Sequence, residues 1–272
     1  FLLGKKDDII IVEADEYDYS FLELEPDIAI ITSVDYDHMD IYKNKNDLEQ
    51  AFIKFVSQIK PNGLLVLEES ILLDFRIPKT ITQIVYSANK KSDCFAQNIN
   101  FRNGTTNFDL FLSGINKKKR NNGSHCNVNF VLPGKHNISN AVAAACVSSY
   151  IGIKNNNIEK ALETFSGIKR RFDIVLHTHK LMYIDDYAHH PDEVTSTINT
   201  VKELFPERFV TVVFQPHLFS RTQSLAHDFA MSLSLADQLI LLDIYPAREE
   251  PITGVDSKML LDLCLNPKKE TC

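Results

Sequence analysis

Short apolar runs of strand length alternate with segments of helical periodicity along much of this chain of 272 residues. A run of four to eight apolar residues is typical of a buried strand, and apolar residues three and four positions apart are typical of an amphipathic helix. The order strand, helix, strand favours parallel pairing. In the first part of the chain, strands are predicted at residues 8–13, 27–33, 64–67 and 81–86, with a helix at 47–59. The sequence therefore predicts an α/β fold with a mainly parallel sheet.

Residues 94–132 depart from this order. Apolar and polar residues alternate here with period two, and Asn-Gly pairs stand at 103–104 and 122–123. Such pairs are typical of the tight turns of antiparallel hairpins. We expect a small antiparallel subsheet, followed by helices at residues 136–150 and 157–165.

A second α/β unit is predicted after a linker at residues 167–172. Its strands are expected at 181–185, 209–214 and 238–243, and its helices at 191–204 and 220–235. Two domains are the normal number for a chain of this length. We expect them to span residues 1–172 and 173–272.

The charge balance argues against a nucleic-acid or anionic membrane partner. The chain has 29 Lys and Arg against 36 Asp and Glu, a net charge of −7, whereas binding to phosphates requires clustered basic residues. The apolar runs are far shorter than the ~20 residues of a membrane helix, and no signal peptide is recognisable. Five cysteines without a CxxC pair favour a reducing compartment, so we expect a cytoplasmic protein.

Two acidic clusters follow predicted strands, where ligands gather in open α/β sheets. The first, residues 13–18, has four carboxylates, beginning with Glu13, and the second, residues 35–40, has three carboxylates around His38. Packed carboxylates repel unless a cation lies among them, which favours a Mg²⁺ site. An acidic helix start for the first cluster and an exposed loop for the second are equally acceptable interpretations.

Two further polar clusters have other chemistry. His136, Asn137 and Asn140 open a predicted helix, where the amides could contact a ribose or base, or merely cap the helix. Residues 185–191 and 214–221 follow successive predicted strands and bring His, Asp and Arg to one edge, which favours a functional site. Arg170 and Arg171, in the predicted linker, could bind an anion or form an interdomain ion pair.

Several common motifs are absent from the sequence. Gly-Lys occurs at 4–5 and 134–135, and neither pair fits GxxGK[ST] or GxxxxGK[ST], so the chain contains no phosphate-binding P-loop. It also lacks GxGxxG, GxSxG and cysteines at zinc-binding spacing.

Six strings of this sequence, in this order and spacing, resemble the Mur ligase family. They are VEADEYD (12–18), TSVDYDHMD (32–40), PGKHNISN (133–140), GIKRRF (167–172), DDYAHHP (185–191) and FQPHLFSRT (214–222). The resemblance covers nearly the whole chain. It implies a central ATPase-type domain followed by a Rossmann-like C-terminal α/β domain.

The resemblance also implies an activity. DDYxHHP and FQPH favour the branch that joins L-alanine to the carboxylate of UDP-N-acetylmuramate in peptidoglycan synthesis, with ATP and Mg²⁺. The most similar alternative within the family is the ligase that recycles murein tripeptide. Because the chain begins at Phe1 and has no P-loop, we expect a fragment that is inactive alone. The resemblance implies that the first domain is incomplete at its N-terminus and the second at its C-terminus. A noncatalytic module that binds a nucleotide or a partner is the other open alternative.

Site residues are implied position by position. Glu13 and His38 resemble the family's magnesium-site residues. His136, Asn137 and Asn140 resemble its adenine and ribose contacts, and Arg171, Asp186 and His189 resemble its residues on the ATP side. Tyr187, His217 and Arg221 resemble the groups that receive alanine. Leu218 departs from the family, because many relatives carry Arg at that position.

Overall fold

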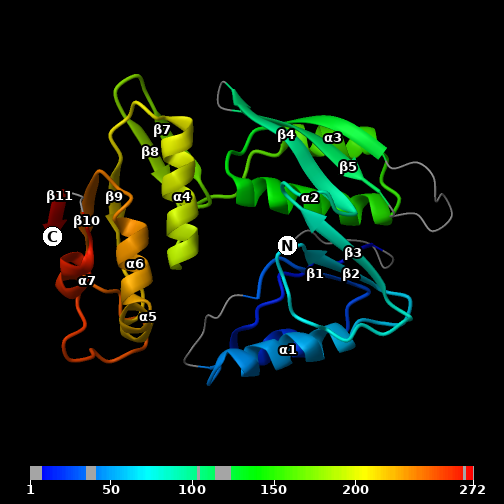
Figure 1. Ribbon diagram of the computed structural model, residues 1–272, viewed down its shortest axis with the longest axis horizontal. Coiled ribbons are helices and arrows are strands. Elements are labelled where there is room, and N and C mark those ends of the chain that lie inside the picture. Colours follow the sequence, from blue (N-terminus) through cyan, green and yellow to red (C-terminus); the bar gives the residue numbers. More distant parts are fainter. Residues whose placement is uncertain (1–7, 35–40, 103–104, 114–123, 266–267, 272) are drawn as a thin grey trace. The chain divides into compact units, whose positions relative to one another are not determined.

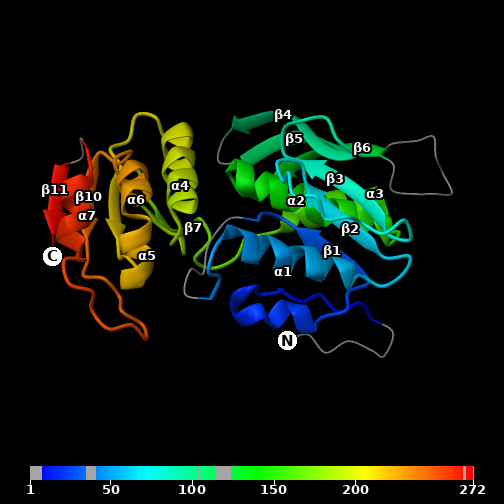
Figure 2. The same cartoon turned by 60° about the horizontal axis from the view of Figure 1, so that its bottom comes forward.

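The computed structural model describes residues 8–34, 41–102, 105–113, 124–265 and 268–271. The chain divides into two compact units, residues 1–84 and 85–272. Figures 1 and 2 show the course of the chain through helices and strands. Each unit is described by itself.

The first unit packs one helix against parallel strands (Figure 2). It contains the 3-10 helix η1 (Tyr17–Glu23), strand β1 (Ile28–Ile31), helix α1 (Lys45–Ser57), strand β2 (Leu64–Glu68) and the start of β3 (Thr82–Ser87). β1 and β2 are parallel, with Ile28 opposite Leu64. Asn44 caps α1 by accepting a hydrogen bond from the Asp47 N–H. Its core holds the side chains Phe21, Ile31, Leu48, Phe55, Val56 and Leu65.

The strand predicted at residues 8–13 is not formed. Residues 8–13 belong to no described strand, and Ile10 and Ile11 are 85% and 93% exposed. An apolar run becomes a buried strand only where a neighbouring strand and a covering layer enclose it. Among the described residues, nothing gives this segment that cover, so the prediction was wrong here.

Strands β1 to β6 form one sheet in chain order. β3 pairs in parallel with β4 (Cys94–Arg102), and β4, β5 (Thr105–Leu112) and β6 (Ser124–Phe130) are antiparallel. Alternate residues of β5 are buried, from Thr106 to Leu112. Helices α2 (Lys135–Tyr150) and α3 (Asn155–Thr164) lie along this part of the sheet (Figure 1). The predicted antiparallel subsheet is confirmed, and with it the mixed α/β fold class.

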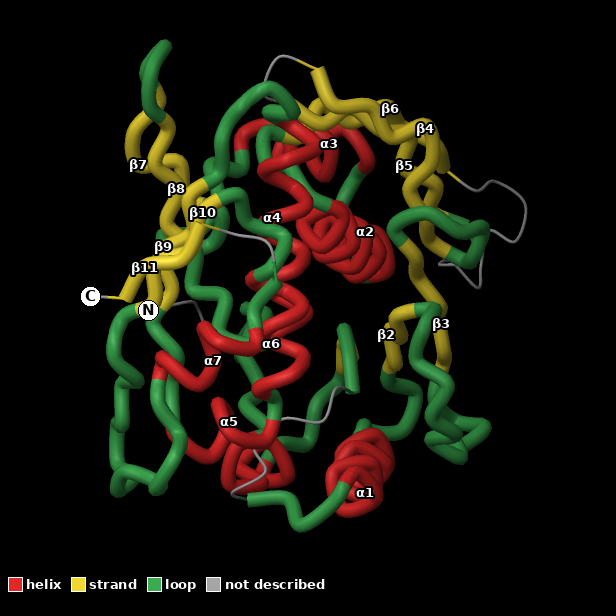
Figure 3. The backbone as a smooth tube through the Cα atoms, turned by 60° about the vertical axis from the view of Figure 1, so that its left-hand side comes forward, coloured by secondary structure: helices red, strands yellow, loops and turns green. Residues whose placement is uncertain are grey.

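The last part of the chain has two smaller sheets. β7 (Asp173–His177) and β8 (Met182–Asp185) form an antiparallel pair, and β9 (Thr211–Phe214), β10 (Gln238–Leu241) and β11 (Lys268–Thr271) form a parallel sheet in the order β11-β10-β9. Figure 3 shows these three strands side by side, with helices near them. The helices are α4 (Pro191–Leu204), α5 (Phe219–Ser224), α6 (Ala226–Leu233) and α7 (Ser257–Leu263).

Two details differ from the sequence prediction. The helix expected at 220–235 is divided at Leu225 into α5 and α6. Strand β7 begins directly after the predicted linker, where no strand was expected. The linker itself is a tight turn with left-handed backbone at Gly167, Arg170 and Phe172.

Candidate functional site

His136 lies at the start of α2, where the chain turns at Gly134. Gly134 has φ +95°, a backbone conformation that favours glycine, and a Cβ there would lie tightly at 3.0 Å from the His136 ring and 3.2 Å from Thr200 Oγ1 on α4. His136 Nδ1 is 3.0 Å from Ser196 Oγ, also on α4. Burial lowers the pKa of His136. The Asp186 carboxylate raises this pKa, and the Arg171 guanidinium lowers it. The ring is therefore neutral at neutral pH.

Asn137 and Asn140 occupy the first turns of α2. The Asn137 side chain donates a hydrogen bond to the Pro133 carbonyl over 2.7 Å, so it stabilises the turn that leads into the helix. Asn140 is exposed. The Asn137 contact is not the helix cap considered from the sequence, because α2 begins after Gly134 without a hydrogen bond from a capping side chain.

Arg170 and Arg171 project from the linker turn beside Tyr187. Their guanidinium carbons lie 4.8 Å and 5.7 Å from the centroid of the Tyr187 ring. The Tyr187 N–H donates to the Arg170 carbonyl over 2.7 Å. Cation–π contacts and this backbone bond hold the loop after β8 against the linker turn.

Asp186 connects the same two segments through its carboxylate. One oxygen accepts a hydrogen bond from the Phe172 N–H and the other from the Ala188 N–H, both over 2.8 Å. Because both oxygens bind backbone, Asp186 fixes the shape of the loop that carries Tyr187 and His189. This structural role was not predicted from the sequence.

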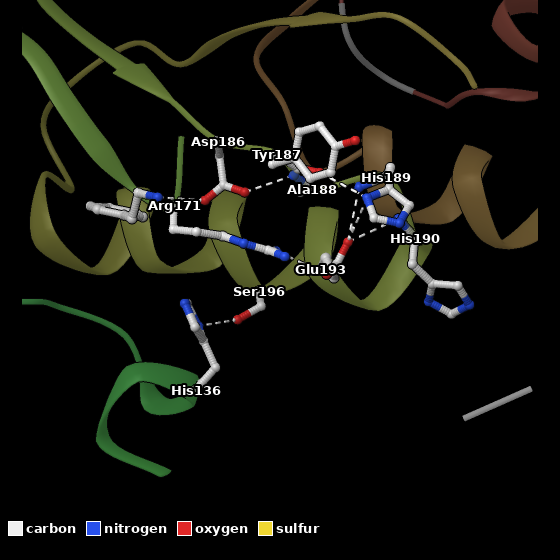
Figure 4. A network of polar contacts seen from close by, with 10 residues as sticks. His136, Arg171, Asp186, Tyr187, Ala188, His189, His190, Glu193 and Ser196 are labelled. Atoms are coloured by element: carbon white, nitrogen blue, oxygen red, sulfur yellow. Dashed lines mark hydrogen bonds and ion pairs between the residues drawn. The ribbon is translucent and has the colours of Figure 1, made fainter. Parts of the chain in front are cut away.

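His189 and His190 stand immediately before α4 (Figure 4). His189 Nδ1 is 2.9 Å from the Tyr187 carbonyl oxygen, and its ring contacts the Tyr187 ring at 5.3 Å between centroids. Nδ1 also lies 3.5 Å from Glu193 Oε2, so the described polar contacts of the ring are made by this nitrogen.

Glu193 contacts both histidine amides, and sequence reasoning missed it. Its carboxylate accepts hydrogen bonds from the N–H groups of His189 and His190, and it lies 3.3 Å from Arg171 Nη1 (Figure 4). Burial alone would raise the pKa of Glu193, but the His189 N–H and the nearby positive charges hold it below its usual value. A Pro at the first helical position with Glu two residues later is a helix-start signal that could have indicated this residue.

The segment after β9 carries His217, Leu218 and Arg221. The His217 ring stacks on Tyr245, and the Leu218 N–H donates to the Tyr245 carbonyl over 3.0 Å. Leu218 is buried with φ +70°, so it does not occupy an ordinary surface position. Arg221 is 7% exposed. Glu249, also missed from the sequence, accepts a hydrogen bond from the Ser220 N–H over 3.0 Å.

The two segments after β8 and β9 approach each other. Burial lowers the pKa of His217, and the charges of Arg221 and His189 lower it further. The charges of Asp186, Arg171 and Glu193 likewise act on the pKa of His136. The structure therefore brings seven of the predicted residues into two adjoining groups. These are His136, Arg171, Asp186, Tyr187 and His189 in one group and His217 and Arg221 in the other.

The predicted magnesium pair is described only in part. Glu13 is exposed in a segment without regular structure, and His38 lies outside the described residues. Next to Glu13, Asp15 accepts a hydrogen bond from the Tyr17 N–H over 2.9 Å. No group of three or more His, Cys, Asp or Glu suited to a metal occurs within the described ranges. An exposed carboxylate is a suitable oxygen ligand for Mg²⁺, but the described residues alone do not make a site.

None of the helices described here has the length and apolar character needed to cross a membrane.

Comparison with known proteins gives matches over both parts of the chain. The Mur ligase middle domain family matches residues 2–148, and the Mur ligase glutamate ligase domain family matches residues 170–269. A protein of Parabacteroides distasonis named UDP-N-acetylmuramate--L-alanine ligase is 43% identical over 271 residues, which is 100% of this chain and 57% of that protein. A ligase of the same name from Flavobacterium psychrophilum is 43% identical over 99% of this chain and 56% of its own length.

Solved structures agree with these matches. The UDP-N-acetylmuramate-alanine ligase of Thermotoga maritima has a TM-score of 0.71 at 25% identity, over 93% of this chain and 53% of that one. A murein peptide ligase of Psychrobacter arcticus has a TM-score of 0.61 at 21% identity, over 93% of this chain and 51% of that one, which shows the shared fold. This chain thus spans a little more than half the length of the curated relatives quoted above. Because two domain families of one ligase group match in succession across it, the chain belongs to the Mur ligase family.

Proposed function

We propose that this chain is the nucleotide-binding and amino-acid-binding part of an ATP-dependent, ADP-forming ligase that joins L-alanine to UDP-N-acetylmuramate. The observation that carries the proposal is the set of polar contacts made by His136, Arg171, Asp186 and His189 at the start of α4 and in the loop before it. Identity of 43% with ligases of this name supports the choice of reaction.

We place the domain boundary between residues 172 and 173. The second family match begins at residue 170, close to this position, and the tight turn at residues 167–172 ends at it, which supports the proposal. The first domain would provide His136, Asn137, Asn140 and Arg171, and the second would provide the remaining residues of the two groups. The reaction would therefore use side chains on both sides of the boundary.

The proposed reaction has two steps. A carboxylate oxygen of UDP-N-acetylmuramate attacks the γ-phosphorus of ATP, the bond to the bridging oxygen breaks, and ADP leaves. The amine of L-alanine then attacks the carbonyl carbon of the acyl phosphate, the C–O bond breaks, and phosphate leaves as the amine loses its proton. Phosphorylation is needed because a carboxylate is a poor electrophile, and positioning with charge stabilisation provides the catalysis.

The nucleotide would lie near the start of α2. His136 is neutral at neutral pH because burial lowers its pKa, so it suits contact with a base or ribose. Asn137 and Asn140 are assigned to the same nucleoside. Arg171, on the exposed linker turn, would pair with phosphate oxygens, which a guanidinium contacts through two parallel hydrogen bonds. Asp186 and His189 would complete the ATP side, with Asp186 holding the loop.

L-Alanine would lie between the segments after β8 and β9. Arg221 would bind its carboxylate, and His217 and Tyr187 would border the amine and methyl group. The lowered pKa of His217 keeps its imidazole neutral near pH 7, so the ring can accept a hydrogen bond from the amine. Arg221 is the proposed carboxylate partner because Leu218 has no charge.

Mg²⁺ would accompany ATP and stabilise charge on the transferred phosphate. Glu13 and His38 are the proposed metal-site residues, and the exposed Glu13 carboxylate offers oxygen ligands of the kind that Mg²⁺ prefers. We also propose a cytoplasmic location, where ATP and nucleotide-sugar substrates meet, with small molecules rather than nucleic acids or membranes as partners.

The proposal is tested with a chimaera in which this chain replaces the matching segment of the Parabacteroides distasonis ligase, so that the flanking parts of that ligase stand on both sides of it. With ATP, Mg²⁺, UDP-N-acetylmuramate and L-alanine, ADP and the amide are expected in equal amounts. Replacing L-alanine by murein tripeptide should give little product. Faster reaction with the tripeptide would favour the recycling ligase, and a folded chimaera that is inactive with both would favour the noncatalytic module.

A further inference from the structure

Two neighbouring carboxylates at the start of α4 have different surroundings. The Asp192 side chain is 84% exposed, and its one described contact is with His190 Nδ1 at 3.9 Å. The Glu193 side chain is 37% exposed and has three described partners. The pair therefore offers a candidate and a matched control in the same helical turn.

The two oxygens of Glu193 bind different segments. Oε2 accepts hydrogen bonds from the N–H groups of His189 and His190, over 2.9 and 3.2 Å. Oε1 lies 3.3 Å from Nη1 of Arg171. One carboxylate thus joins the linker turn to the loop after β8, as Figure 4 shows.

The same face of α4 reaches α2. Ser196 follows Glu193 by three residues, which places the two side chains on one face of the helix. Ser196 Oγ is 3.0 Å from His136 Nδ1. The first two turns of α4 therefore contact both His136 and Arg171.

A carboxylate partner restricts an arginine at an exposed turn. The Arg171 side chain is 48% exposed, and a free arginine side chain has many rotamers to lose when it binds an anion. An anion fixed by two backbone amides limits the positions of the guanidinium before any phosphate arrives, which reduces the ordering cost of binding.

We infer that Glu193 is a positioning residue that orients the Arg171 guanidinium toward the nucleotide phosphates and holds the His189–His190 backbone in the matching arrangement. The inference rests on the proposed function, because it takes Arg171 as a phosphate-binding residue. Glu193 acts through Arg171 and does not itself contact the nucleotide.

A helix cap alone would use only Oε2, and the substitution Glu193→Gln separates the two roles. Glutamine keeps one oxygen, which can still accept from the His189 and His190 amides. Its NH₂ group would then face the guanidinium, donor against donor. The cap is retained and the contact with Arg171 is lost.

The experiment is a double-mutant cycle on ATP affinity, measured by calorimetry with the chimaera described above, which supplies the phosphate-binding loop. We expect Glu193→Gln to weaken ATP binding about three- to tenfold, and Asp192→Asn to change it less than about twofold. In an Arg171→Gln background, Glu193→Gln should cause no further loss. Equal losses in both backgrounds, or an unchanged affinity in Glu193→Gln, would overturn the inference.

A second measurement needs no nucleotide. The Glu193 carboxyl is titrated by NMR in the wild-type chain and in Arg171→Gln, where loss of the guanidinium should raise its pKa. An unchanged titration overturns the inference and leaves the proposed function intact. A raised pKa together with a chimaera that binds no ATP overturns the nucleotide site of the proposed function, and the inference with it.

Discussion

His217 stacks on Tyr245 with ring centroids 5.4 Å apart and 18° between the ring planes. The two residues also form an isolated parallel bridge between the segments after β9 and β10. The Tyr245 N–H donates to the Pro216 carbonyl over 2.8 Å, and the Leu218 N–H donates to the Tyr245 carbonyl. The segment after β10 thus fixes the orientation of a proposed alanine-site residue.

Removing the ring of Tyr245 should weaken alanine binding. A pair of stacked rings contributes about 0.5–1.5 kcal/mol, so Tyr245→Ala in the chimaera should raise the KM for alanine about two- to tenfold. Tyr245→Phe should retain the wild-type KM. Tyr183→Ala, at a 54% exposed tyrosine of β8, serves as the control. An unchanged KM in Tyr245→Ala would exclude this role.

Arg221→Ala should reduce kcat/KM for alanine. Loss of a charge-assisted pair costs roughly 1.5 to 3 kcal/mol, which corresponds to a roughly tenfold to hundredfold decrease. The KM for ATP should change much less, since the nucleotide is assigned to other residues. Because Arg221 is buried, thermal unfolding of Arg221→Ala and Arg221→Lys is measured in parallel. Wild-type alanine kinetics in a folded Arg221→Ala enzyme would place the amino acid elsewhere.

Stability should fall as the pH decreases from about 7 to 5.5 because of His136 and His217. Burial lowers both pKa values, so the unfolded chain, with histidine pKa near 6.5, binds more protons than the folded one. The two histidines therefore make their full contribution to the free energy of unfolding above pH 6.5, and this contribution is lost as the pH falls toward their pKa values in the folded chain. The lowered carboxyl pKa values act only below about pH 4.5.

Urea unfolding at pH 7.5 and 5.5 measures this effect. The loss of unfolding free energy between the two pH values should be smaller in His136→Gln and smallest in the double variant with His217→Gln. His179→Gln, at an exposed histidine of the β7–β8 turn, should behave like the wild type. An equal loss in all four chains would contradict the assignment.

Asp186→Asn should destabilise the chain by about 1–3 kcal/mol. Both carboxylate oxygens accept from backbone N–H groups, and asparagine would turn an NH₂ group toward one of them. Asp185→Asn is the neighbouring control, because Asp185 forms only a long described ion pair, 3.8 Å from Arg170 Nε. The free energies of unfolding of the two variants are compared by urea unfolding at pH 7.5. Equal values would show that the two hydrogen bonds from backbone N–H groups to Asp186 contribute little.

The chain assayed without any added segment should form no amide from ATP, Mg²⁺, UDP-N-acetylmuramate and L-alanine. The sequence contains no GxxGK[ST] string, and that loop supplies the backbone amides and Lys that hold the phosphates. The chimaera serves as the positive control. Release of ADP that depends on both UDP-N-acetylmuramate and L-alanine would contradict this prediction.

Periodicity was sufficient to predict the regular elements. The helix expected at residues 191–204 has those bounds in the structure, and the hairpin strands follow the period-two pattern of residues 94–132. These elements bury one regular face, and such a face is visible in the spacing of apolar residues. The division at Leu225 is not visible there, since both α5 and α6 fit one continuous helical pattern.

The site was less predictable than the fold. His136, Arg171 and His189 were predicted mainly from the resemblance to the Mur ligase family, whereas Glu193 looked like any acidic residue of a first helical turn. Tyr245 and Glu249 were missed because their importance comes from tertiary contacts with residues 216–220. Contacts between segments distant in sequence leave no local periodic signal.

The exposed run Ile9–Val12 has a consequence for handling the protein. Four consecutive β-branched apolar residues outside any described strand have the local composition from which intermolecular β-sheets grow. A net charge of −7 disfavours association through general repulsion, but salt screens that repulsion and leaves the short-range attraction of the segment. The colloidal stability of concentrated samples should therefore decrease as salt is added.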